Sequence, residues 1–351
     1  MEKEKSSEEF EEELINVLKL VAPGTALRTA LDDISKGGLG GLMVIGNTPA
    51  IMNIINGGFE LNCKFTPQKL IELCKMDGAI ILDNESKKII YANTLLVPDF
   101  MISTNETGTR HKAAERTAKQ TNQFVIAISE RKKHITLYKG NMKYVLKSTS
   151  EVLSRAGETI RMLEKHREIL HELLLNLNVL EFTNLASLSD VVLVLQRMEI
   201  CERIADIIRR YIVELGAEGT LVKIQLKELI KGIAEEEILL LKDYSKKEPL
   251  LTKVHLNEIT LEDLIEPANI LKVLSYAKID EIVVTKGVRI LNKVSFAQED
   301  MQKLIDRFGN LQSLLDSPSE NLIELLGENK ARILQRELNH LKEQVMLGKK
   351  I

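Results

Sequence analysis

The sequence changes its pattern near Ser148, and this change limits the folds that the chain can adopt. Before Ser148, short apolar runs that are typical of strands alternate with helical segments. After it, apolar residues recur at spacings of three, four or seven, which predicts helices that pack on one another. We therefore expect an α/β domain with a mixed sheet, followed by an all-helical spine. The apolar seam of the first long helix comprises Leu153, Ala156, Ile160, Leu163, Leu170, Leu174 and Leu177.

Capping residues and turn residues place the elements that we expect before Ser148. Thr25 is the expected N-cap of one helix and Thr66 that of another. An earlier helix is expected to begin after Ser6 or Ser7. Helices that alternate with hairpins indicate a mixed sheet with helices packed against it. The expected strands lie at residues 42–45, at 79–92 as a hairpin, and at 124–129, 135–138 and 144–146.

Asp77 lies where the helix that starts near Thr66 gives way to the strand that starts at Ala79. The neighbouring Gly78 would let a flat ligand approach the backbone. A carboxylate at such a corner can hold a divalent cation. Asp-Gly by itself is more often an ordinary turn, so this motif indicates a site only in combination with a second one.

A second motif, Thr107-Gly108-Thr109-Arg110-His111-Lys112, opens a helical run. The free N–H groups of a helix start, threonine hydroxyls and three potential cations together suit a phosphate rather than a base. Positive charge in a first helical turn opposes the helix dipole by about 0.3 kcal/mol or more per residue, which a bound anion would offset. A solvated basic helix start is the alternative. Combined with Asp77, the motif predicts nucleotide chemistry.

Length, charge and cysteine content narrow the class of protein. The 351 residues suffice for two or three domains, and a formal net charge of −3 gives no sign of bulk attraction to nucleic acid or anionic membrane. Cys63, Cys74 and Cys201 are odd in number and lack metal-ligand spacing, so reduced core thiols are expected. The N-terminus lacks a signal-peptide pattern, and no apolar run approaches eighteen residues. We expect a cytoplasmic protein with no membrane contact.

Residues 1–147 resemble the diadenylate cyclase domain, and the whole chain is similar to the bacterial DNA-scanning members of that family. The family usually has Gly-Ala-Leu where this chain has Gly41-Leu42-Met43, arginine at the position of Lys112, and threonine at that of Ala113. Lys112 keeps the charge but not the planar fork of arginine. The resemblance rests on Pro23-Gly24-Thr25-Ala26-Leu27-Arg28, Ala30-Leu31-Asp32-Asp33-Ile34, Gly41-Leu42-Met43-Val44, Asp77-Gly78-Ala79 and Arg110-His111-Lys112.

The resemblance implies that two ATP molecules, bound in active sites that face each other across a dimer, form cyclic di-AMP and pyrophosphate. It assigns Mg²⁺ or Mn²⁺ to Asp77 and implies a ring-like homo-octamer that branched double-stranded DNA inhibits. Asp77, Arg110 and His111 would be the catalytic residues. The residues that would bind ATP are Gly78, Ala79, Leu96, Thr109, Arg110, His111, Lys112, Ser129 and Lys132.

Ser129 ends an apolar run, and polar residues in this position often lie at the ligand-binding rim of a sheet. The residues from Ser129 to Lys132 are equally compatible with an ordinary polar turn. The roles of Ser129 and Lys132 in phosphate binding are therefore implied by the resemblance rather than by the residues themselves.

The C-terminal residues resemble a helix-hairpin-helix DNA-binding domain, whose hairpin N–H groups contact the phosphate backbone. The second hairpin would be Leu322–Leu334, although Leu325 replaces one of the usual two glycines, and the first would be Ile282–Leu291. From Lys278 onward there are 12 Lys plus Arg against 11 Asp plus Glu, so a helical docking domain with reduced DNA affinity is the alternative. The residues expected to contact DNA are Lys286, Gly287, Gly327, Lys330 and Arg332.

The predicted domains are therefore a cyclase domain at residues 1–147, a helical spine at 148–277 and a helix-hairpin-helix domain at 278–351. Two other functions fit the residues. The chain could be a DNA-scanning structural protein whose nucleotide domain only senses ATP or cyclic di-AMP. It could also be a nucleotidyltransferase that joins AMP to another acceptor, and product identity separates this possibility from cyclisation.

Overall fold

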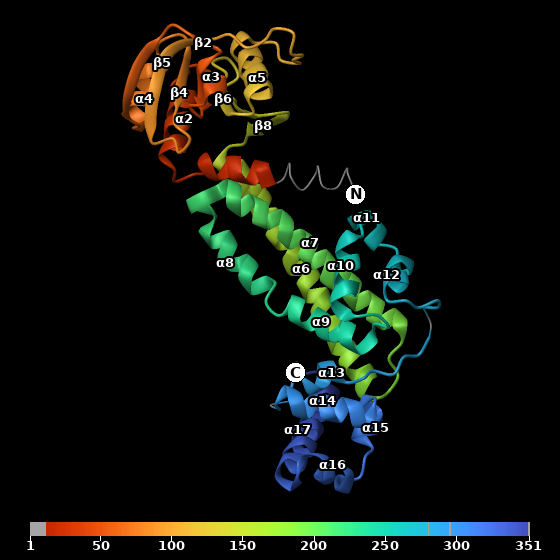
Figure 1. The fold of residues 1–351 in the computed structure, drawn as a ribbon. Coiled ribbons are helices and arrows are strands. Elements are labelled where there is room, and N and C mark those ends of the chain that lie inside the picture. The colour runs from red at the N-terminus through yellow and green to blue at the C-terminus, as the bar shows by residue number, and fades with distance from the viewer. Residues whose placement is uncertain (1–11, 280, 295, 350–351) are drawn as a thin grey trace. The chain divides into compact units, whose positions relative to one another are not determined.

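The computed structural model describes residues 12–279, 281–294 and 296–349. The chain divides into two compact units (Figure 1). The first runs to Gly157 and takes in Arg209–Lys223, and the second comprises Glu158–Ile208 and the chain from Ile224 onward. The expected helix start at Ser6 or Ser7 lies outside the described residues, although residues 12–20 are helical. The division into three domains stays a prediction, because the two units group the spine with the C-terminal helices.

The first unit is built on a mixed sheet, which confirms the predicted fold class. Strands follow one another in the order β2-β5-β4-β1-β6-β7-β8, and β3 pairs with β5. β1 and β4 are parallel, whereas the other pairs are antiparallel. The strands are β1 (Gly41–Ile45), β2 (Ile55–Asn56), β3 (Phe59–Lys64), β4 (Ala79–Leu82), β5 (Lys88–Leu96), β6 (Phe124–Ile128), β7 (Ile135–Lys139) and β8 (Met142–Leu146).

The strands β2 and β3 were not predicted. β3 has exposed residues on both faces, so it shows neither an apolar run nor a clean alternation. Its Asn62 has a φ of 43°, and its pairing with β5 shifts register between Glu60 and Cys63. Such an irregular strand forms because β5 supplies a partner, which is information that the local sequence lacks.

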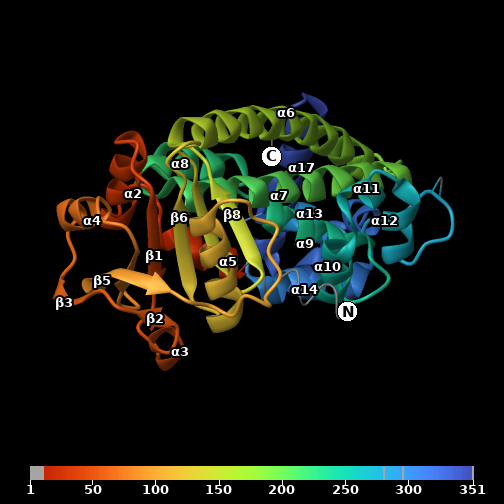
Figure 2. The ribbon, with the colours of Figure 1, turned by 90° about the horizontal axis from the view of Figure 1, so that it is seen from above.

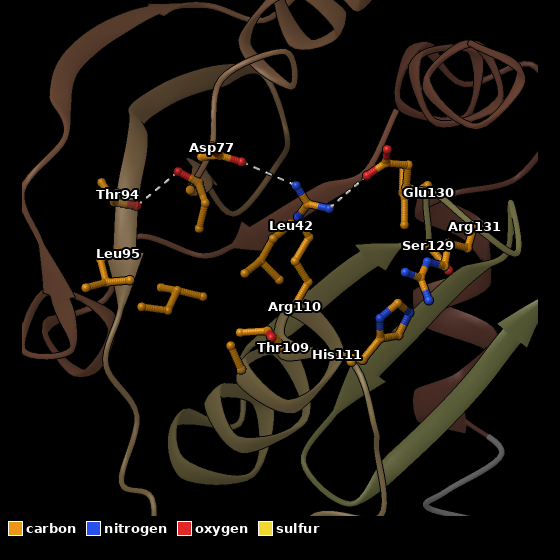
Figure 3. Close-up of a pocket in the computed structure, with 16 residues that line it drawn as sticks. Leu42, Asp77, Thr94, Leu95, Thr109, Arg110, His111, Ser129, Glu130 and Arg131 are labelled. Carbon is orange, nitrogen blue, oxygen red and sulfur yellow. Dashed lines mark hydrogen bonds and ion pairs between the residues drawn. The ribbon is translucent and has the colours of Figure 1, made fainter. Parts of the chain in front are cut away.

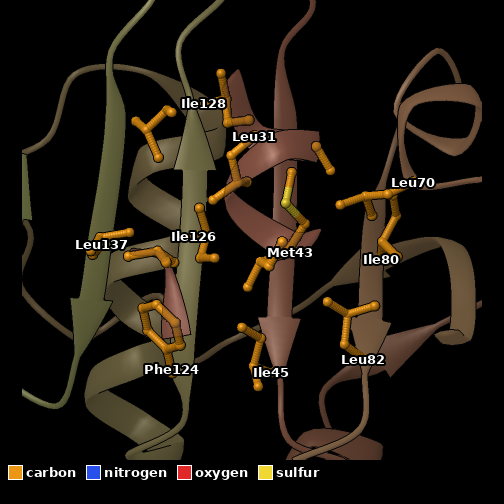
Figure 4. Close-up of a cluster of buried hydrophobic side chains, with 14 of the residues drawn as sticks. Leu31, Met43, Ile45, Leu70, Ile80, Leu82, Phe124, Ile126, Ile128 and Leu137 are labelled. Atoms are coloured by element: carbon orange, nitrogen blue, oxygen red, sulfur yellow. The ribbon is translucent and has the colours of Figure 1, made fainter. Parts of the chain in front are cut away.

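Helices cover both faces of the sheet, which makes its central strands apolar throughout. On one face, α2 (Ala26–Lys36) and α4 (Pro67–Leu73) place Leu31 and Leu70 against Met43, Ile80 and Ile126 (Figure 4). On the other face, α5 (Thr109–Thr121) and α3 (Pro49–Met52) pack on alternate residues of the same strands (Figure 2). Each such buried aliphatic side chain contributes about 1.5–3 kcal/mol of transfer free energy.

The predicted helix caps are confirmed. The hydroxyl of Thr25 accepts a hydrogen bond of 3.1 Å from the N–H of Arg28, and that of Thr66 accepts one of 3.3 Å from the N–H of Lys69. Each cap fixes where its helix begins. Cys74 and Cys201 are buried and Cys63 is half-buried, all as free thiols. Burial raises the pKa of Cys74 to about 12, against the opposing effect of Arg110.

After Leu146 the described chain is helical apart from an isolated bridge between Ser187 and Ile282. Leu153, expected on the buried seam of the first long helix, is 38% exposed, whereas most other seam residues are buried. The helices are α6 (Thr149–Phe182), α7 (Leu188–Leu215), η1 (Gly216–Gly219), α8 (Thr220–Leu229), α9 (Ile233–Tyr244), α10 (Pro249–Glu258), α11 (Leu261–Leu264), α12 (Pro267–Val273), α13 (Val288–Leu291), α14 (Gln298–Phe308), α15 (Leu311–Leu315), α16 (Ser319–Leu326) and α17 (Glu328–Met346).

A buried ionic cluster joins three helices of the second unit. Arg289 of α13 is 1% exposed and forms ion pairs with Glu181 of α6 and, at 2.9 Å, with Glu236 of α9. The hydroxyl of Tyr244 donates a 2.8 Å hydrogen bond to Glu181. The carboxylate of Asp243 accepts hydrogen bonds from the first N–H groups of α13. These contacts hold the short helix α13 in place, because four residues form no stable helix alone.

Within the described residues, every helix is too short or too polar to cross a lipid bilayer.

Candidate functional site

The residues of both predicted nucleotide motifs meet at one cavity of about 570 Å³ in the first unit (Figure 3). Five segments that are distant in the sequence contribute to its wall: the start of β1, the corner before β4, the end of β5, the start of α5 and the turn after β6. The lining residues are Leu42, Asp77, Gly78, Ala79, Thr94, Leu95, Leu96, Gly108, Thr109, Arg110, His111, Ala113, Ile128, Ser129, Glu130 and Arg131.

Asp77 lies at the predicted corner between α4 and β4, with its carboxylate fully exposed to the cavity side. Its Oδ1 is 3.5 Å from Nη2 of Arg110, and Nη1 of Arg110 is 3.8 Å from Oε2 of Glu130. The guanidinium of Arg110 therefore spans the mouth of the cavity between two carboxylates. Exposed ion pairs of this length are worth little, so an incoming anion could displace either one at low cost.

Two glycines make this arrangement possible. A Cβ on Gly40 would lie 2.2 Å from Nη1 of Arg110, so the guanidinium occupies the space that a side chain would fill. Gly78 has a φ of 103°, and a Cβ there would lie 2.9 Å from the carbonyl oxygen of Thr94. The absence of a side chain at Gly78 thus lets the backbone of β5 approach, which places Ala79 and Leu96 on the cavity wall.

The start of α5 has the features of an anion site. Gly108 is its N-cap with a φ of −84° and provides no side-chain hydrogen bond, and the first turn contains no acidic residue. Thr109, Arg110 and His111 line the cavity as predicted. An uncapped helix N-terminus with adjacent cations attracts phosphate oxygens. Lys112 follows in the same turn but is exposed and does not line the cavity.

His111 lies beside a polar cluster of Tyr138, Glu106 and Lys143 that the sequence did not reveal. Its ring contacts Tyr138 edge-on, with the centroids 6.4 Å apart. The Tyr138 hydroxyl donates a 2.6 Å hydrogen bond to Oε1 of Glu106, and Nζ of Lys143 lies 2.6 Å from the same oxygen. Burial lowers the pKa of His111, Glu106 raises it, and the cations Lys143, Lys132 and Arg110 lower it further, for a net decrease.

The turn after β6 fits both interpretations of its sequence, an ordinary polar turn and a part of the ligand-binding rim. The Ser129 hydroxyl accepts a 3.2 Å hydrogen bond from the N–H of Lys132, as in an ordinary polar turn, and Ser129 also lines the cavity. The basic residue that lines the cavity here is Arg131, whereas the expected Lys132 is exposed and does not. Glu130 and Arg131 were missed, although they directly follow Ser129.

The opposite wall is apolar. Leu42, Leu96, Ala113 and Ile128 line the cavity together with the groups predicted to bind phosphate, and Leu96 is where it was expected. An apolar wall beside a cationic rim suits a ligand with a flat heterocycle and a phosphate chain. Leu95, which was missed, lines the cavity although it is 62% exposed.

Asp77 is the predicted metal ligand, and in the described part of the chain no group of three or more His, Cys, Asp or Glu side chains converges. Mg²⁺ is usually held by one or two carboxylates together with substrate phosphates rather than by an all-protein cage. A single exposed carboxylate near a helix start that is predicted to bind phosphate fits such an ion.

The predicted second DNA-binding hairpin has the expected geometry of helix, glycine, helix. α16 ends at Leu326, Gly327 has a φ of 83° and a ψ of 158°, and α17 begins at Glu328. Nζ of Lys330 lies 2.5 Å from Asp300, and a guanidinium nitrogen of Arg332 lies 2.6 Å from Glu328. Both cations thus have carboxylate partners, which reduces the positive charge that they offer to DNA.

The predicted first hairpin at Ile282–Leu291 is wrong in its helical content. Within the predicted hairpin, residues 282–286 form no helix, and the short α13 directly follows Gly287. The exposed Lys286 donates a 3.0 Å hydrogen bond to the carbonyl of Lys242, and Gly287 packs against Leu311. The carboxylate of Asp243 in α9 accepts hydrogen bonds from the N–H groups of Val288 and Arg289, so α13 is capped by another helix rather than by the residues before it.

Comparisons with known proteins extend these observations to the whole chain. Residues 28–143 match a family model described as the DisA bacterial checkpoint controller nucleotide-binding domain (DAC), and residues 146–283 match the DisA bacterial checkpoint controller linker region. The curated DNA integrity scanning protein DisA of Clostridium perfringens (strain 13 / Type A) is 42% identical over 349 residues, which cover 97% of this chain and 99% of the relative. That of Clostridioides difficile (strain 630) is 41% identical and covers 96% and 98%. This chain therefore belongs to the DisA family, with a DAC nucleotide-binding domain followed by the family's helical linker.

Proposed function

We propose that this protein condenses two ATP molecules into cyclic di-AMP and two pyrophosphates. The observation that carries the proposal is the convergence of Asp77, the start of α5 and Ser129 on one cavity of about 570 Å³. Membership of the DisA family supports the same chemistry. The cavity is sized for a single nucleotide, so the proposed reaction needs the cavities of two protomers to face each other.

In the proposed reaction, the 3′-hydroxyl oxygen of each ATP attacks the α-phosphorus of the other. Two P–O bonds form, two P–O bonds to pyrophosphate break, and the hydroxyl protons pass to solvent. The protein contributes positioning and charge stabilisation rather than a covalent intermediate. An ATP bound in one protomer alone has no second α-phosphorus within reach, which makes the facing arrangement part of the proposal.

The residues of the cavity suit this chemistry in distinct ways. The N–H groups at the start of α5, with Thr109 and Ser129, would bind phosphate oxygens, and Arg110 would leave its carboxylate partners to contact the triphosphate. Asp77 would hold Mg²⁺ or Mn²⁺, which supplies positive charge to the phosphates when bound. The apolar wall that includes Leu96 would receive the adenine.

We further propose that branched double-stranded DNA regulates the cyclase through the C-terminal helices of a cytoplasmic homo-oligomer, an octamer if the family pattern holds. The hairpin at Gly327 presents helix N-terminal N–H groups, which can contact phosphate without reading sequence. Pairing of Lys330 and Arg332 with carboxylates predicts weak binding that depends strongly on salt.

The test is incubation of the full chain with ATP and either Mn²⁺ or Mg²⁺, with and without a four-way DNA junction, followed by chromatography and mass analysis. We expect cyclic di-AMP and pyrophosphate, and less of both when the junction is present. Linear duplex of the same length and base composition is the control for the junction.

Each other outcome identifies a different function. AMP joined to another acceptor would indicate a nucleotidyltransferase. Bound ATP without product would indicate a sensor, and Lys112→Arg with Ala113→Thr would then be the first substitutions to restore turnover. Product formation that the junction does not change would still support the cyclase and would assign the C-terminal helices to protein docking.

A further inference from the structure

A second cavity, of about 370 Å³, lies entirely within the second unit. One wall is a stripe of α6 that includes Arg167, His171, Leu174 and Asn178, spaced so that they share one helix face. The other walls come from Met198 of α7, the first two turns of α9, and the segment around α13. The nucleotide chemistry proposed above uses none of these residues.

The ion pairs around this cavity leave two cations without a carboxylate. Glu236 is paired with Arg289 at 2.9 Å and with Lys293 at 2.8 Å, and Arg289 is also paired with Glu181, so two carboxylates balance these two cations. The two cations without a carboxylate are Arg167 and Lys231, whose side chains have no ion-pair partner within the described residues. Arg167 donates a 3.2 Å hydrogen bond to the backbone carbonyl of Lys231. The nearby Glu235 offsets one of the two charges. The lining thus retains an excess of positive charge.

The same cavity receives a helix N-terminus. α9 begins after Gly232, whose φ of 78° and ψ of 0° turn the chain and whose position offers no side-chain cap. Gly232, Ile233 and Lys231 all line the cavity. The twelve residues of α9 direct the positive end of the helix dipole towards the cavity. Arg167 reaches this turn from α6, so both charge and dipole act at one rim.

Asn178 supplies an independent indication of a ligand. It lines the cavity, is 5% exposed, and its Oδ1 has no hydrogen-bond partner among the described residues. A buried amide oxygen without a hydrogen-bond partner destabilises the fold unless a ligand supplies a donor. Leu174 and Met198 are among the apolar residues that line the same cavity. A ligand with a donor group at one end and an anion at the other would satisfy both ends.

We propose that this cavity binds a phosphate-bearing small molecule about the size of a mononucleotide. Its phosphate would lie at the N-terminus of α9 between Arg167 and Lys231, and a donor group such as an exocyclic amine would reach Asn178. A cavity of about 370 Å³ favours a compact ligand over a DNA strand, whose backbone carries a charge at every nucleotide. Because the walls belong to α6, α9 and the α13 segment, the ligand would stiffen the packing of these three elements.

The test is isothermal titration of the full chain with AMP, ribose 5-phosphate and inorganic phosphate. The titrated protein carries Arg110→Ala and His111→Ala, which remove two of the cations that the first cavity would offer to phosphate. We expect one AMP per chain. Lys231→Ala should weaken AMP about tenfold, as expected for a lost charge-assisted contact. Lys227→Ala, which removes an exposed lysine one helical turn earlier, is the matched control and should change the dissociation constant less than about twofold.

Asn178→Leu tests the contact with the donor group of the ligand separately from the contact with its phosphate. It should weaken AMP by about fivefold or more while leaving inorganic phosphate unchanged, because only AMP carries the donor group. Unchanged melting temperatures for the lysine variants would show that their fold is intact.

Three results would overturn the proposal. One is absence of AMP binding in the Arg110→Ala, His111→Ala chain, and another is equal weakening by Lys227→Ala and Lys231→Ala. The third is loss of duplex DNA binding in Lys231→Ala without any AMP binding, which would assign this rim to DNA. Because none of these measurements depends on product formation, failure here is distinct from failure of the proposed cyclase.

Discussion

The hydroxyl of Tyr138 donates a 2.6 Å hydrogen bond to Oε1 of Glu106, and this bond ties the loop before α5 to strand β7. His111 rests edge-on against the same tyrosine. Burial lowers the pKa of His111 below its ordinary 6.5, and Glu106 partly opposes this decrease. Glu106→Gln should therefore lower the pKa of His111 further.

The pKa of the His111 imidazole, measured by NMR over a range of pH, tests this expectation. The charge of His111 is fully present below its pKa and is lost as the pH rises through that value. The part of the affinity for ATP that depends on this charge should fall in a window below pH 6.5, and Glu106→Gln should move the window to lower pH. Glu115→Gln, which removes a different acid paired with Lys119, is the control. An unchanged His111 pKa in Glu106→Gln would contradict the assignment.

Asp77→Asn should reduce the rate of product formation by roughly 100-fold or more, because the amide no longer supplies negative charge to a divalent cation. ATP binding should largely persist, since the start of α5 and Glu130 still hold the phosphate-binding groups in place. Titration of ATP and a timed assay of product separate the two effects. Asp33→Asn, an exposed acid on α2, serves as the control. Intact activity in Asp77→Asn would remove this residue from the mechanism.

Gly40→Ala should displace the guanidinium of Arg110, because the new Cβ would lie 2.2 Å from Nη1. We expect ATP affinity to decrease by about tenfold, comparable to loss of one charge-assisted hydrogen bond. The double variant with Arg110→Ala shows whether the effect passes through Arg110. If so, adding Gly40→Ala to Arg110→Ala should cause little further loss, whereas additive losses would point to a general disturbance of β1.

Arg289→Met should destabilise the second unit by about 3–5 kcal/mol, because Glu181 would remain buried without its cation. Chemical denaturation followed by circular dichroism measures this loss. Arg332→Met removes an exposed pair with Glu328 and should be close to neutral. Equal stability of the two variants would mean that the cluster of Glu181, Arg289 and Glu236 contributes no more than a surface ion pair.

Gly327→Ala should destabilise the hairpin between α16 and α17 by about 1–3 kcal/mol. The cost comes from the backbone alone, because a φ of 83° with a ψ of 158° is essentially restricted to glycine, while a Cβ would meet nothing within 4 Å. Denaturation and a junction-binding assay should both show the change. A variant of normal stability and normal DNA affinity would show that the hairpin conformation is dispensable.

Local signals in the sequence were sufficient to predict many of the helices and strands of the first unit. Thr25 and Thr66 cap the helices where expected, because an N-cap acts through a hydrogen bond only three residues away. The apolar runs at 42–45 and 124–129 became central strands of the mixed sheet, because burial on both faces leaves a continuous apolar pattern. The motifs at Asp77 and Thr109–His111 identified two sides of the nucleotide cavity.

Tertiary structure alone decided the rest, because the interactions involved join residues that are far apart in the chain. Glu106 pairs with Tyr138 and Lys143, and Gly40 makes room for Arg110, without any local pattern that links them. Arg131 lines the cavity where Lys132 was expected, because the direction of each side chain in the turn decides which of them reaches the cavity. The sequence by itself determined which elements form and which residue types could bind a nucleotide. Packing of the sheet and helices determined which of those side chains meet, since electrostatic and hydrogen-bond contacts act only at short range in space.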